Sequence, residues 1–163
     1  MWRKMLKDDL FLVNKLSDEI HINYPEGSEI FEERFNLYPD GCFVLQNQNC
    51  LVGYAISHPW IEFSIPPLNS FLNEIPDSCN TYYIHDIAIA PSERGQGFSK
   101  EIMAILKDYA QKLNFSSLSA VAVNKSTPIW IKEGFRIVDV SFLQEKLKSY
   151  DNEAVYIQYH YSI

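Results

Sequence analysis

The chain has 163 residues, of which 47% are apolar and 14% aromatic, and this composition excludes an intrinsically disordered protein. The net charge of −7, without a run of Lys or Arg, argues against nucleic acid binding, and no apolar run approaches a membrane span. Three cysteines without C-x-x-C spacing predict neither a zinc site nor disulfides, which is typical of a reducing cytoplasm. The length fits one domain over residues 1–163.

Hydrophobic periodicity and turn residues divide the first half of the chain into short elements. They predict a strand at 2–6, a helix from Asp8 or Asp9 to Ile20, a short helix from Ser28, and hairpin strands at 42–46 and 51–57. Residues 58–80 contain four prolines and are expected to form a long irregular insertion. Insertions of this length in a compact domain are usually functional.

The second half of the chain alternates strands and helices. In order it predicts a strand at 82–90, a helix from Phe98 to Leu113, a strand at 118–123, a short helix, a strand at 135–141, a helix-prone stretch at 142–153 and a closing strand at 154–161. No repeat, low-complexity tract or interdomain linker interrupts this pattern.

The turn before the helix at Phe98 carries the strongest chemical signal. A glycine-bearing turn at a helix N-terminus directs backbone N–H groups and the positive end of the helix dipole at one place, which suits phosphate. Gly95 and Gly97 allow positive φ there. The turn is neither a P-loop, because Lys-Ser/Thr does not follow Gly97, nor a dinucleotide fingerprint, because Lys100 replaces the third glycine.

The spacing of Arg94, Gly97 and Ser99 resembles the acetyl-CoA pyrophosphate loop of the GNAT superfamily of N-acetyltransferases, Arg/Gln-x-x-Gly-x-Gly/Ala. Ser99 departs from the last position of that pattern but is small. Downstream, Asn124 ends a strand, and Trp130 begins an aromatic-x-x-x-Gly-Phe sequence, as in the superfamily. The resemblance implies an α/β (α+β) GNAT fold. It has a mixed, twisted seven-stranded sheet, about four flanking helices and central parallel strands that splay apart.

The resemblance also implies a cytoplasmic, acetyl-CoA-dependent N-acetyltransferase that acts on a primary amine, here a small molecule, without a metal. In that fold, pantetheine pairs with exposed backbone groups of the splayed strands. The cofactor-binding residues that follow are Ile87, Ala88, Ile89, Arg94, Gly95, Gln96, Gly97, Phe98, Ser99, Lys100, Asn124 and Trp130.

Acetyl transfer needs a base for the ammonium and a hydrogen-bond donor for the oxyanion. His85 is the first candidate base, since an imidazole titrates near ~6.5, and residues 85–89 resemble arylalkylamine N-acetyltransferases, which have a catalytic histidine here. Asp86 is an alternative base or orienter, although strand alternation places it opposite His85 unless a bulge intervenes. Trp130 stands where many relatives have a Tyr that protonates the leaving sulfur, and an indole cannot do so.

Aromatic residues near the insertion are candidates for the acceptor pocket. The substrate-binding residues that we expect are Trp60, Phe63, Tyr83 and His85. Packing of the insertion against the domain is the favoured alternative explanation for its aromatics. Two other functions stay open, a non-catalytic acyl-CoA-binding module and a protein or peptide N-acetyltransferase. The expected partners are acetyl-CoA and an amine acceptor, not nucleic acid or membrane, and a homodimer is left open.

Overall fold

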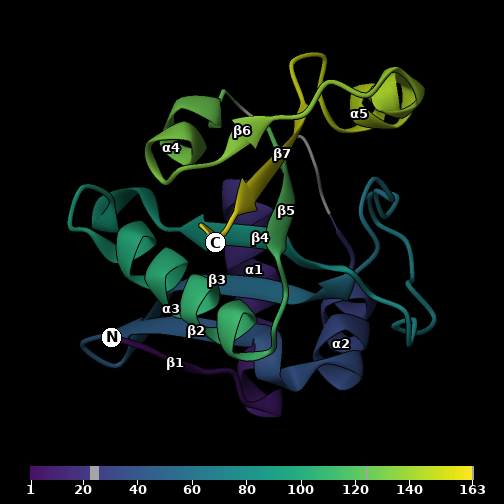
Figure 1. Cartoon of the computed structure of the whole chain (residues 1–163). Helices are drawn as coiled ribbons and strands as arrows, with labels where there is room; N and C mark the ends of the chain where they lie inside the picture. Colours follow the sequence, from purple (N-terminus) through teal and green to yellow (C-terminus); the bar gives the residue numbers. More distant parts are fainter. Residues whose placement is uncertain (23–25, 124, 163) are drawn as a thin grey trace.

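The computed structural model describes residues 1–22, 26–123 and 125–162. Within these residues seven strands form one sheet with the order β1-β2-β3-β4-β5-β7-β6 (Figure 1). The strands are β1 (Trp2–Lys4), β2 (Cys42–Asn47), β3 (Cys50–Trp60), β4 (Thr81–Ile89), β5 (Ser117–Ala122), β6 (Arg136–Ile137) and β7 (Val155–His160). The α-helices are α1 (Leu10–Ile20), α2 (Ser28–Leu37), α3 (Phe98–Lys112), α4 (Thr127–Lys132) and α5 (Gln144–Tyr150).

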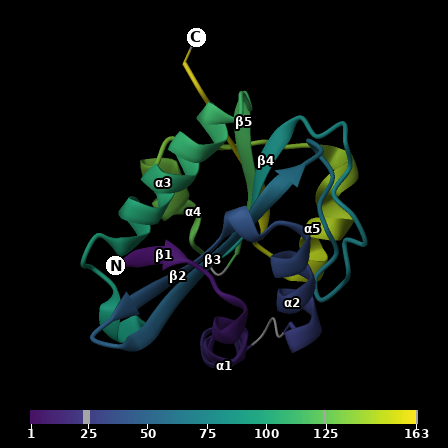
Figure 2. The same ribbon diagram turned by 90° about the horizontal axis from the view of Figure 1, so that it is seen from below.

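The helices cover both faces of the sheet. Helix α3 packs Ile102 and Leu106 against one face, because its apolar residues recur at helical spacing. Helices α1 and α2 cover the other face with Val13 and Phe31, and the two layers are visible in Figure 2. A third buried cluster joins α5 to Ile65 of the β3–β4 connection. The sheet therefore lies between two layers of helices.

The central strands β4 and β5 diverge. They are parallel, and their pairing runs from Tyr82–Leu118 to Ile84–Ala120. Strand β4 continues to Ile89 in contact with β3 alone among the described strands. Parallel strands that separate leave backbone N–H and C=O groups without strand partners. The mixed seven-stranded sheet with splayed central strands is thus confirmed.

Strand β4 contains a β-bulge where the splay begins. Ile56 of β3 pairs with Asp86, but the next residue, Ser57, pairs with Ile84. His85 is therefore the extra residue on β4, and the alternation of side chains is interrupted at this point. As a result, His85 and Asp86 both contact residues of the α1–α2 side of the sheet. The bulge is thus the exception under which strand alternation does not place the two side chains on opposite faces.

Other departures from the predicted elements are small. The strand expected at 135–141 is only β6, because after Val138 donates to Tyr156 O the chain leaves the edge of the sheet. Strand β3 extends to Trp60, so the insertion begins at residue 61. Five α-helices are present in the described chain rather than about four. No described helix combines the length and apolarity that a bilayer crossing requires. The three cysteines are free.

Candidate active site

The turn before α3 has the backbone shape that its glycines predict. Gly95 and Gly97 have φ of 81° and 85°, a region that side-chain-bearing residues rarely adopt. Gly97 is the N-cap of α3, and no side chain caps the first turn. The free N–H groups of that turn and the positive end of a 15-residue helix therefore face solvent, as an anion site requires.

The turn is also open. A Cβ atom added at Gly95 or Gly97 would meet nothing within 4 Å. Arg94 Nε donates to Ile89 O at 3.2 Å, which ties the turn to the end of β4. Ser99 and Lys100 are exposed. Gln96 Nε2 donates to Glu93 Oε2 at 3.3 Å, so one carboxylate also lies beside the turn.

The backbone of β4 beyond Ile84 borders the splay. Ile87 and Ile89 pack toward the α3 core and Ala88 toward the α1–α2 core, so the side chains are structural. The His85 side chain is only 3% exposed although the residue as a whole is half-buried, which places the exposure on its main chain. These residues can therefore offer backbone groups to an extended ligand. Asn124, expected beside them, lies outside the described residues.

His85 forms a buried pair with Glu26, just before α2. His85 Nε2 lies 2.9 Å from Glu26 Oε1, and the two side chains are 3% and 6% exposed. Burial acts to raise the pKa of Glu26. Attraction to His85, hydrogen bonds from His85 and Asn69, and the Arg34 charge overcome this effect and lower that pKa to about 2.

The ionised carboxylate determines the tautomer of His85. A carboxylate only accepts hydrogen bonds, so the proton of a neutral His85 ring is on Nε2 and donated to Glu26. Nδ1 then carries a lone pair, and this atom is buried without a hydrogen-bond partner in the described structure. A ring held by a carboxylate on one nitrogen, with the other nitrogen free, is the arrangement of a general base.

The carboxylate of Asp86 contacts two other side chains. Tyr54 OH donates to Asp86 Oδ2 at 2.5 Å, and His21 Nε2 lies 3.1 Å from Oδ1. Burial acts to lower the pKa of His21, but the charge and hydrogen bond of Asp86 raise it overall. Asp86 therefore links the end of α1 to β3 and β4, and it has no contact with His85 among the hydrogen bonds described.

Trp130 lies within α4 and is half-buried. Its Nε1 donates to Ser126 Oγ at 3.2 Å, and its ring meets Phe135 edge-on at 5.0 Å. Gly134, with φ of 94°, ends the helix and lets Phe135 turn back so that its N–H donates to Trp130 O. This accounts structurally for the aromatic-x-x-x-Gly-Phe pattern.

The expected acceptor residues pack against different neighbours along β3, β4 and the connection between them. Tyr83 is buried between His58 and His85, with ring centroids 5.6 and 6.5 Å away. Trp60 packs edge-on against His58, and its Nε1 is buried without a partner in the described structure. Phe63 is 37% exposed, has φ of 62°, and packs on Tyr156.

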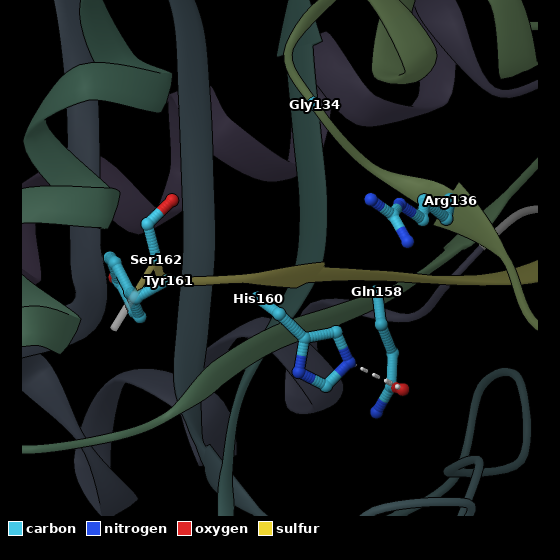
Figure 3. A pocket seen from close by; sticks show the side chains of 6 residues that line it. All are labelled: Gly134, Arg136, Gln158, His160, Tyr161 and Ser162. Atoms are coloured by element: carbon cyan, nitrogen blue, oxygen red, sulfur yellow. Dashed lines mark hydrogen bonds between the residues drawn. The ribbon is translucent and has the colours of Figure 1, made fainter.

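A pocket of about 310 Å³ opens elsewhere, at the edge formed by β6 and β7 (Figure 3). Its lining residues are Gly134, Arg136, Gln158, His160, Tyr161 and Ser162. Figure 3 shows the contact of 3.3 Å between His160 Nε2 and Gln158 Oε1. None of the site residues predicted from the sequence lines this pocket, and we do not assign it to the site.

Glu26 and His21 are the two residues that sequence reasoning missed. Both belong to the connection between α1 and α2, and each contacts β4 more than 50 positions away. Neither lies in a motif, so no local signal identifies them. Only the bulge at His85 brings both of their partners to one face.

Comparisons with known proteins agree with this fold. Residues 7–130 match the model of the acetyltransferase (GNAT) family, whereas no curated protein matches the chain. The GNAT-like decarboxylase GphF in complex with isobutyryl-CoA is 12% identical, with a TM-score of 0.80 and 98% of each chain covered. Ard1 from Thermoplasma volcanium is 13% identical, with a TM-score of 0.74 and 100% of this chain and 98% of that chain covered.

N-acetylglutamate synthase from Neisseria gonorrhoeae, complexed with coenzyme A and N-acetyl-glutamate, is 14% identical, with a TM-score of 0.74. The match covers 100% of this chain and 35% of that chain. At these identities the structures show a shared fold, and they do not support the narrower resemblance to arylalkylamine N-acetyltransferases. The family model covers most of the chain, and the chain therefore belongs to the GNAT acetyltransferase family.

Proposed function

We propose that the protein transfers an acetyl group from acetyl-CoA directly to a primary amine, with His85 as the general base. The observation that carries this proposal is the buried Nδ1 of His85, which has no hydrogen-bond partner in the described structure. Glu26 holds the other ring nitrogen, Nε2, and the ring lies where β4 and β5 separate. The turn at Gly95 and Gly97 supplies the pyrophosphate site, and the β4 backbone beyond His85 supplies the pantetheine site.

The residues of the chain divide the chemistry as follows. Nδ1 of His85 takes a proton from the ammonium, and Glu26 stabilises the imidazolium that forms. The Ile87 N–H is the donor that we assign to the developing oxyanion, since it lies two residues from the base. Acetyl-CoA supplies the thioester carbonyl and a thiolate leaving group. Trp130 packs against the core and has no proton to give at neutral pH.

Acetyl transfer to a panel of amines tests the proposal. The panel contains polyamines, aromatic amines, aminoglycosides and peptides, because the fold is shared by the NatC complex, solved with Gag peptide and CoA, and by N-acetylglutamate synthase. We expect coenzyme A release that depends on one class of amine. His85→Gln keeps a hydrogen bond to Glu26 but offers no comparable base, and it should lower kcat roughly 10²-fold at pH 7.

The affinity of the His85→Gln variant for acetyl-CoA should stay unchanged, because backbone groups hold the cofactor. Binding of acetyl-CoA without release of coenzyme A for any amine would favour the alternative of an acyl-CoA-binding module. Wild-type kcat in His85→Gln, with chemistry rate-limiting, would remove His85 from the reaction.

A further inference from the structure

Glu26 contacts two parts of the molecule with its two carboxylate oxygens. Oε1 accepts from His85 Nε2, and Oε2 accepts from the backbone N–H of Asn69 at 3.1 Å. Asn69 belongs to residues 61–80, which connect β3 to β4. Its own Oδ1 accepts from Gly27 N at 2.8 Å, so Asn69 is hydrogen-bonded both to the Glu26 carboxylate and to the backbone of the next residue.

The 61–80 segment is fastened to α2 close to this contact. Glu33 accepts from Leu72 N at 2.7 Å and from Asn73 N at 3.0 Å, while Arg34 Nη2 donates to Ser70 O at 3.0 Å. The Arg34 guanidinium is itself buried and paired with Glu33 at 2.6 Å. The adjacent side chains of Glu33 and Arg34 on α2 thus hydrogen-bond the backbone of residues 70–73.

A second anchor lies on the opposite side of the segment. Ile65 is 1% exposed and packs with Leu143 and Leu147. Tyr150 OH donates to Pro66 O. Figure 2 shows the segment running past α2 and α5. Its contacts with both helices flank Asn69 and bring this residue to Glu26.

We propose that Glu26 is the positioning residue of His85, and that the 61–80 segment, through Asn69, holds Glu26 in the orientation that keeps the free lone pair on Nδ1. The inference rests on the proposed function, in which His85 is the base. Glu26 does not touch the substrate. It acts by fixing the tautomer and the orientation of the ring and by stabilising the charge that the ring gains.

The substitution Glu26→Gln separates these roles from simple packing. Its amide oxygen and NH₂ group must face His85 and Asn69 in one order or the other. If the NH₂ group faces His85, it donates to Nε2 and the ring proton moves to Nδ1, which then cannot accept a proton. If the NH₂ group faces Asn69, it meets the backbone N–H of Asn69, which is also a donor, and the hydrogen bond to the segment is lost.

The experiment compares Glu26→Gln with Glu32→Gln, a matched loss of one charge at an exposed position of α2. We expect Glu26→Gln to lower kcat about 10²-fold with an unchanged KM for acetyl-CoA, and Glu32→Gln to match the wild type. The double variant Glu26→Gln/His85→Gln should lose no more activity than His85→Gln alone, because Glu26 acts through His85.

Two measurements keep the test decisive if Glu26→Gln folds poorly. Nitrogen NMR of ¹⁵N-labelled histidine should show His85 as the Nε2–H tautomer in the wild type and a loss of that tautomer in Glu26→Gln. Asn69→Gly accepts the φ of 53° but lacks the acceptor for Gly27 N, and should lower kcat roughly fivefold, the effect of one hydrogen bond.

The outcomes distinguish this inference from the proposed function. No transfer to any amine by the wild type would overturn the proposed function and the inference with it. Transfer by the wild type with equal kcat in Glu26→Gln and Glu32→Gln would overturn the inference alone. An Nδ1–H tautomer of His85 in the wild-type protein, or additive losses in the double variant, would also overturn it.

Discussion

The two buried histidines beside Tyr83 differ in the partners of their ring nitrogens. His85 has a carboxylate on one nitrogen, whereas His58 donates from Nδ1 to the carbonyl of Pro59 at 2.9 Å. His58 Nε2 is buried without a partner in the described structure, and burial lowers the pKa of His58 to about 3. One strand pair therefore holds one histidine beside a carboxylate and one whose protonation is opposed by burial.

This difference predicts an acid-sensitive stability that depends on His58. In the unfolded chain a histidine binds a proton below about 6.5, but folded His58 does so only near 3. The unfolded state thus holds more protons, and the free energy of unfolding should fall as pH drops through this window, by roughly 1 kcal/mol per pH unit. Urea unfolding of the wild type and of His58→Gln between pH 6 and pH 4.5 measures the slope, which should be smaller in the variant.

The chosen pH range separates His58 from the other shifted groups. His21 has a raised pKa, so its contribution to the free energy of unfolding is complete below about pH 6.5 and is lost only as the pH rises. Glu26 has a lowered pKa, and its contribution is lost only below about 4.5. An equal slope in the wild type and in His58→Gln would show that His58 is accessible to a proton in the folded state.

At the scale of elements, sequence periodicity predicts the features that depend only on residues close together in the chain. The alternation around Ile87 and the helical stripe through Ile102 and Leu106 place β4 and α3 within one or two residues of their observed bounds. The glycines of the turn likewise predict its positive φ angles. Each of these features is determined by local sterics and by one apolar face, and both are visible in a short window of sequence.

Features that depend on strand register were not predictable in this way. The bulge at His85 arises from the pairing of β3 with β4, and alternation along β4 alone gives the wrong face for Asp86. The Glu26–His85 pair joins residues 59 positions apart. Strand β6 is short because its pairing with β7 stops at Ile137. The candidate base was therefore predictable from sequence, but its buried partner was not.

The turn before α3 gives the test at this scale. Gly97→Ala and Gly97→Glu share the strain of a side chain at φ 85°, and neither Cβ meets an atom within 4 Å. Only Gly97→Glu adds a negative charge at the helix N-terminus. If phosphate binds there, calorimetry should show at least about tenfold weaker acetyl-CoA binding by Gly97→Glu than by Gly97→Ala. Equal affinities of the two variants would remove the pyrophosphate from this turn.

At the scale of the whole molecule, the fold places three separate chain segments around the splay. The α1–α2 connection brings Glu26 to His85, α3 brings its N-terminus to the end of β4, and β5 diverges on the other side. The net charge of −7 opposes an anionic ligand overall, so binding depends on local donors such as Arg94 and the first turn of α3. The same negative field favours the approach of a cationic amine.

Binding of acetyl-CoA should therefore stabilise the folded protein as a whole and protect one strand in particular. At a concentration 100 times the dissociation constant, linkage adds about 2.7 kcal/mol, which corresponds to a rise in Tm of roughly 5–10 °C. NADH, which has a pyrophosphate but no pantetheine, should give no comparable rise. Hydrogen exchange should slow at residues 85–89 and 95–100, where pantetheine and pyrophosphate supply acceptors for exposed N–H groups. Exchange in α5 should stay as it was. Stabilisation with unchanged exchange at 85–89 would mean that the ligand binds outside the splay between β4 and β5.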